Sequence, residues 1–139
     1  MKQSYVAVRV VLGIVAVAHI VTGLVGIMPN SPLSVALVLY GGALQFSPQI
    51  AYLLQIGGAY MLTIGAFSIY AIWNPAKSRN IIHGIIFLLS LRGIQRILYA
   101  GEVDTVFGQV PGYYWIQTVL FLAVAVALIL FRPKAVEAA

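Results

Sequence analysis

Cysteine is absent from this chain of 139 residues, and charged residues of either sign are scarce. The absence of cysteine excludes disulfides, thiolate metal sites, iron–sulfur clusters and cysteine nucleophiles. Only three residues are acidic and none falls in an apolar segment, so a zinc or di-iron centre and a buried proton relay would both lack carboxylates. No Ser-His-Asp set, phosphate loop or dinucleotide fingerprint appears. The sequence therefore indicates no catalytic residues and favours a protein that is not an enzyme.

Apolar residues dominate what is present. They make up 62% of the chain against 8% charged residues, and the mean hydropathy is +1.00. A soluble domain carries roughly 25% charged residues, and a chain of this size could not bury so much apolar surface in one core. The formal net charge of +5 does not predict nucleic-acid binding, because the few basic residues are spread along the chain. The composition predicts an all-α protein embedded in a bilayer.

Four apolar segments are long enough to cross the membrane, which takes about 20 residues. They form a single transmembrane domain, a four-helix bundle, with spans at about 5–28, 50–73, 81–101 and 113–131. Between the first two spans, the segment at about 32–46 is apolar but too short to cross. A short helix lying in the interface is the preferred interpretation of this segment, and a re-entrant piece buried against the bundle is the alternative.

The basic residues that flank the spans predict the orientation. They precede or begin the first span, lie between the second and third, and follow the fourth: Lys2 and Arg9, Lys77 and Arg79, Arg132 and Lys134. The two other connections contain no lysine or arginine. By the positive-inside rule, both termini are expected in the cytoplasm. We therefore expect a multi-pass protein of a bacterial-type inner membrane.

Polar side chains recur in the outer half of all four spans. A rise of about 1.5 Å per residue places His19 and Arg92 roughly 13–14 Å below the outer boundary, and Arg96, Gln55 and Gln117 at about 6–8 Å. The spacing of His19 from Ala16, Gly23 and Gly26 puts it on a stripe of small residues, where helices approach closely. We therefore expect His19 to point into the bundle.

The two arginines are the most demanding of these residues, because an arginine near mid-span costs about 2.5–3.5 kcal/mol on insertion scales. Arg96 is expected to reach the headgroups, whereas Arg92 should face protein or a water-filled cavity. Candidate partners are Glu102 and Asp104, as structural ion pairs, and acceptors on Gln55, Tyr60 and Gln117. A purely structural role remains open: the arginines would then fix packing, His19 would be a hydrogen-bonded core residue, and Gln55 would join helices.

The shared depth of these residues nevertheless favours a binding site. Haem ligation by both histidines is excluded because His83 lies near the inner end of its span, and a haem held by His19 alone is disfavoured. Donors on Arg92, Arg96, His19 and Gln55 instead suit a lipid phosphate or a quinone carbonyl. The predicted ligand site therefore comprises Arg92, Arg96, His19, Gln55, Tyr60 and Gln117, with membrane lipid or quinone as the ligand and no metal.

Two segments resemble a known family. The first span, "RVVLGIVAVAHIVTGLVGI", and the second, "LLQIGGAYMLTIGAF", are similar to the opening helices of DoxX-like proteins. The resemblance implies four spans with a cytoplasmic N-terminus, and a membrane subunit linked to thiosulfate and quinone oxidation. Two functions stay open: a non-catalytic subunit that associates with a redox or energy-transducing complex or with itself, and a small oligomeric permease for an anionic or small polar solute.

Overall fold

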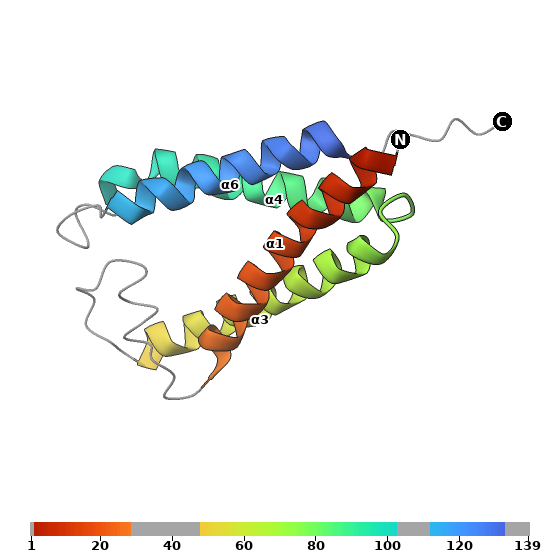
Figure 1. Cartoon of the computed structure of the whole chain (residues 1–139). Coiled ribbons are helices and arrows are strands. Elements are labelled where there is room, and N and C mark those ends of the chain that lie inside the picture. Colours follow the sequence, from red (N-terminus) through yellow and green to blue (C-terminus); the bar gives the residue numbers. More distant parts are fainter. Residues whose placement is uncertain (1, 29–47, 103–111, 133–139) are drawn as a thin grey trace.

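The protein forms four long helices, which a computed structural model describes for residues 2–28, 48–102 and 112–132 (Figure 1). The described residues contain no β-strand. The helices are α1 (Lys2–Ile27), α3 (Pro48–Trp73), α4 (Arg79–Leu98) and α6 (Gly112–Phe131). All four are long and apolar enough to cross a membrane. The expected all-α architecture with four spans is therefore confirmed, while the segment at 32–46 lies outside the described residues.

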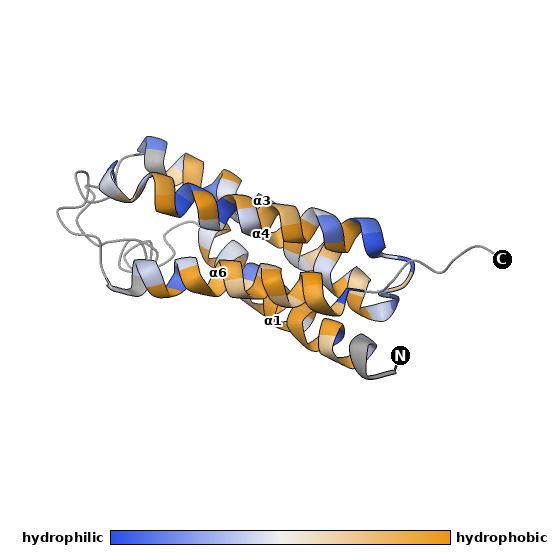
Figure 2. Cartoon of the chain, turned by 90° about the horizontal axis from the view of Figure 1, so that it is seen from above, coloured by the Kyte–Doolittle hydropathy of each residue, from blue (hydrophilic) through white to orange (hydrophobic). Residues whose placement is uncertain are grey.

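The membrane setting explains why these segments are helical. A helix satisfies its backbone hydrogen bonds internally, which the hydrocarbon interior demands. Apolar residues dominate the middle of each helix, and hydrophilic residues gather mainly toward the helix ends (Figure 2). Many large apolar side chains are exposed on the outside of the bundle, among them Val17, Phe87 and Leu130. In a bilayer this surface is available to lipid.

The helices pack as two antiparallel pairs, α1 with α3 and α4 with α6 (Figure 1). Glycines bring the backbones of α1 and α3 together: a Cβ added to Gly58 would lie 2.8 Å from the carbonyl oxygen of Gly23, and one added to Gly26 would lie 3.0 Å from that of Leu54. Such close approach increases the van der Waals contact that holds transmembrane helices together. The small-residue stripe predicted for the first span thus faces α3.

The two pairs meet closely at one end of the bundle and diverge toward the other (Figure 1). We call the half that contains the start of α1 and the turn from Trp73 to Arg79 the proximal half, and the opposite half the distal half. The main apolar core joins all four helices in the proximal half, with Leu12, Ala71, Ile82 and Leu128 fully buried. Divergence leaves the distal half less filled, and the two cavities of the candidate site lie there.

Hydrogen bonds from arginines reinforce the proximal end. Nε of Arg9 donates to the carbonyl oxygen of Ile72 at 3.1 Å, next to the last residue of α3. Arg132, just beyond α6, donates from Nη1 to Nε2 of His83 at 3.4 Å. Cations near helix C-termini also interact favourably with the helix dipole and with the last carbonyl groups. These contacts tie α1 to α3 and α4 to α6 where the two pairs converge.

Candidate functional site

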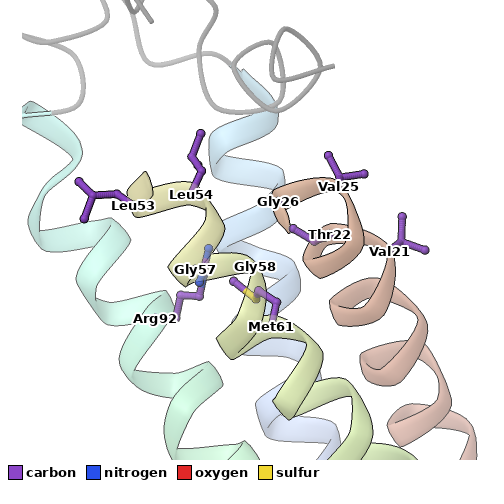
Figure 3. Close-up of a pocket in the computed structure, with 10 residues that line it drawn as sticks. All are labelled: Val21, Thr22, Val25, Gly26, Leu53, Leu54, Gly57, Gly58, Met61 and Arg92. Carbon is purple, nitrogen blue, oxygen red and sulfur yellow. The ribbon is translucent and has the colours of Figure 1, made fainter. Parts of the chain in front are cut away.

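Arg92 lies at the centre of the distal half and borders two adjoining cavities. The first has a volume of about 270 Å³ and lies between α1, α3 and α4. In Figure 3 the side chain of Arg92 extends from α4 toward Gly57 on α3, across the cavity from Thr22 and Val25 of α1. Apart from Arg92 and Thr22 the lining is apolar: Val21, Val25, Gly26, Leu53, Leu54, Gly57, Gly58 and Met61.

The second cavity brings together three of the residues predicted from the sequence. It has a volume of about 180 Å³ and is bordered by all four helices. His19 from α1, Arg92 from α4 and Gln117 from α6 line it, alongside Thr22 and Met61, which it shares with the first cavity. Ala18, Leu120 and Phe121 complete the lining. His19 and Gln117, which are 98 positions apart in the sequence, thus lie with Arg92 in one polar patch that is surrounded by apolar side chains.

The orientation of His19 is fixed by its own helix. The side chain is only 6% exposed, and its Nδ1 lies 2.8 Å from the carbonyl oxygen of Val15. A carbonyl oxygen can only accept, so Nδ1 must carry the hydrogen in this contact. In the neutral imidazole Nε2 then carries the lone pair and is an acceptor. The second cavity therefore presents a permanent cation at Arg92, a ring nitrogen at His19 and an amide at Gln117.

Phe121 contributes to the position of Arg92. The guanidinium carbon of Arg92 lies 5.2 Å from the centroid of the Phe121 ring, within the range of a cation–π interaction. Phe121 also lines the second cavity. An arginine in a membrane interior is expected to face protein or water rather than lipid, and Arg92 does so here. The side chain of Arg92 is half-buried.

Arg96, one turn from Arg92, has a different environment. It is 8% exposed, its Nε donates to Oγ1 of Thr118 at 3.0 Å, and its Nη2 donates to the carbonyl oxygen of Tyr114 at 3.0 Å. It borders neither of the two cavities. This geometry differs from the expectation that Arg96 reaches the headgroups. Tyr114 and Thr118 on α6 hold the guanidinium inside the bundle.

The other predicted residues do not join the cavities. Gln55 is exposed and Tyr60 is 69% exposed, and neither lines either cavity. The side of α3 that lines the first cavity carries Leu54, Gly57 and Met61 instead. Glu102 is exposed, and Asp104 lies outside the described residues. The ion pairs proposed for these two acids therefore stay a prediction.

Several site residues were not identified from the sequence. Thr22 is one turn from His19, and Phe121 is one turn from Gln117, so helical spacing from the predicted residues would have indicated both. The hydroxyl of Thr22 donates to the carbonyl oxygen of Ala18 at 2.7 Å, which directs this donor back to its own helix. Met61 carries no polar signal, and only the packing of α3 reveals it.

Comparisons with family models, with curated proteins and with solved structures found no match to this chain. Within the described ranges, no group of three or more His, Cys, Asp or Glu side chains is placed to hold a metal ion. The candidate site is therefore interpreted from the side chains that line the two cavities. A cationic donor, a ring nitrogen and an amide inside an apolar frame are suited to the oxygen-bearing head of an amphipathic molecule.

Proposed function

We propose that this protein is a non-catalytic membrane subunit whose distal cavities bind the oxygen-bearing head of a lipid or a quinone. The observation that carries the proposal is the position of Arg92, which lines both cavities and shares the second with His19 and Gln117. Arginine is well suited to phosphate and carbonyl oxygens because its planar guanidinium presents several donors in a fixed geometry. The apolar remainder of the lining suits a ring or the start of an acyl chain.

The packing of the proximal half favours binding over transport. A conduction path needs sites along its whole length that an ion can enter and leave. On the proximal side of the cavities lies a buried apolar core that includes Leu12, Ile85, Leu89 and Ala125. The nearest buried polar residue on α3, Ser68, uses its hydroxyl to donate to the carbonyl oxygen of Ile64 at 2.8 Å. This arrangement supports a site that is closed on one side, so the permease is the weaker alternative.

The role as a subunit of a redox or energy-transducing complex is supported by the DoxX-like resemblance of the first two spans and by the outer surface of α6. Ile116, Val119 and Leu130 are large apolar side chains of α6 that are more than half exposed. Either lipid or a partner helix suits such a face. Gentle extraction followed by identification of co-purifying proteins tests this part: repeated recovery of the same redox subunit supports it, and a chain that purifies alone contradicts it.

Binding is tested with two probes, a decyl-substituted benzoquinone and a dialkyl phosphate, titrated calorimetrically into the purified protein in detergent. We expect saturable binding of at least one probe, weakened at least tenfold by Arg92→Met. Gly57→Leu should have the same effect, because a Cβ at Gly57 has no atom within 4 Å and a leucine there would fill the first cavity. The preferred probe then distinguishes carbonyl from phosphate recognition.

Gly13→Leu is the matched control. Gly13 also has no atom within 4 Å of an added Cβ, but it lies in α1 away from both cavities. This variant should bind like the unaltered protein. Absence of saturable binding for both probes, or unchanged binding in Arg92→Met, would contradict the proposed function.

A further inference from the structure

A third cavity lies in the proximal half, on a different part of the bundle from the proposed site. It has a volume of about 410 Å³ and runs between α3 and α4. Ile64 and Phe67 of α3 border it, together with Ile81, Ile85 and Leu88 of α4. Its residues on α4 extend from Asn80 to Leu88, which corresponds to about 12 Å of helix. We call it the α3–α4 groove.

The dimensions and lining of the α3–α4 groove suit one acyl chain. The hydrocarbon core of a bilayer is about 30 Å thick, so a single leaflet contributes about 15 Å. A groove about 12 Å long that begins near the first residue of α4 therefore spans most of one leaflet. Gly84 leaves the middle open, since an added Cβ there would meet no atom within 4 Å. Asn80, at the end nearest the turn, is the polar exception in the lining.

Among the described residues, the charges around this end of the groove are all positive. Exposed Lys77 and half-buried Arg79 lie within three residues of Asn80. On the neighbouring face of α4, Arg132 donates to His83. The acidic residue in the described part of the chain, Glu102, follows the opposite end of α4. Basic residues next to a membrane surface attract anionic lipids, by about 1 kcal/mol for each lysine or arginine.

We infer that the α3–α4 groove binds an anionic phospholipid. One acyl chain occupies the groove between Phe67 and Ile85, and the phosphate lies by Asn80 and Lys77, where its charge is complemented. The groove alone would accept any acyl chain, and the basic end selects a headgroup with net negative charge. This site is separate from the distal cavities, so it neither requires nor follows from the proposed function.

Native mass spectrometry of the detergent-purified protein tests the inference. The protein is mixed with phosphatidylglycerol or with phosphatidylcholine of the same acyl chains, and the retained lipid is counted. We expect one phosphatidylglycerol to be retained at least tenfold more strongly than phosphatidylcholine. Gly84→Leu, which fills the groove, should lower that retention at least tenfold. Lys77→Gln, at an exposed position, should reduce the preference for the anionic headgroup without abolishing lipid binding.

Two controls separate this site from its alternatives. Gly13→Leu, at an open position of α1 that borders neither the groove nor the distal cavities, should leave phosphatidylglycerol retention unchanged. If Gly57→Leu removes the lipid while Gly84→Leu does not, the lipid occupies the distal cavity and the inference is wrong. Inorganic phosphate in excess should not displace the lipid, because the groove also binds the acyl chain, which inorganic phosphate lacks. Equal retention of both phospholipids would also overturn the inference. Thermal unfolding of each variant checks its fold, and Lys77→Gln gives a second test if Gly84→Leu does not fold.

Discussion

Arg96 and Tyr114 hold each other in place across the interface between α4 and α6. The guanidinium carbon of Arg96 lies 3.8 Å from the centroid of the Tyr114 ring, and the hydroxyl of Tyr114 donates to the carbonyl oxygen of Arg96 at 2.8 Å. Arg96 in turn donates to the carbonyl oxygen of Tyr114. A cationic side chain and a ring are thus joined by stacking and by reciprocal bonds to backbone oxygens. This reciprocity assigns Arg96 to packing and leaves Arg92 as the arginine that borders the cavities.

Removing the Tyr114 hydroxyl should therefore destabilise the bundle without affecting the cavities. Tyr114→Phe deletes one buried hydrogen bond, and we expect the free energy of unfolding to fall by about 0.5–1.5 kcal/mol. The measurement is reversible unfolding in mixed micelles. Tyr70→Phe is the control, because Tyr70 is exposed on α3 and should show no change. Equal stability of the Tyr114→Phe variant and the unaltered protein would contradict the structural role of this pair.

The same substitution at two adjacent glycines should change the free energy of unfolding in opposite directions. In Gly58→Ala the new Cβ would lie 2.8 Å from the carbonyl oxygen of Gly23, so α1 and α3 must separate, and overpacking of this kind costs about 1–3 kcal/mol. In Gly57→Ala the new Cβ meets no atom within 4 Å, and the higher helix propensity of alanine contributes up to about 1 kcal/mol. Unfolding in the same micelles compares them; similar effects of the two substitutions would argue against the close contact of α1 with α3.

Apolar length and the scarcity of charge are sufficient to predict the four spans. Both are properties of whole segments, and the membrane requires about 20 apolar residues whatever the neighbouring helices do. Pro48 is a local signal as well, because proline is favoured at the first position of a helix and α3 begins at this residue. The site was harder to predict, because it depends on how each helix is rotated about its axis.

The position of each polar residue along its helix could be predicted from the sequence, but the direction in which its side chain points could not. Each residue turns the helix by about 100°, so Gln55 and Tyr60 of α3 can share a depth range with the cavities and still face away from them. The rotation of α3 is set by its contact with α1 at Gly58 and Gly65, which is a property of two helices together. Likewise, depth alone placed Arg96 within reach of the headgroups, whereas Tyr114 and Thr118 of a distant segment retain it inside.

The orientation predicted from the basic residues is tested by labelling, and the absence of cysteine makes the experiment direct. Single cysteines are introduced as Glu102→Cys, beyond the distal end of α4, and as Lys77→Cys, in the proximal turn; both positions are exposed. With both termini in the cytoplasm, an impermeant thiol reagent added to intact cells should label the first variant and not the second. The reverse pattern would place the distal cavities on the cytoplasmic side.

Reconstitution into liposomes distinguishes a binding protein from a permease. An anion held by Arg92 would have to leave the second cavity through the proximal core, where Val8, Leu12, Ile82 and Leu128 are completely buried. Moving a charge through such packing requires either a water-filled path or a rearrangement of all four helices. At that end Arg9 joins α1 to α3 and Arg132 joins the end of α6 to α4, so we expect a rearrangement within either pair to be opposed. Purified protein should accordingly give no anion flux above that of empty liposomes. Robust flux that Arg92→Ala abolishes would reverse this conclusion and make transport the function of the distal cavities.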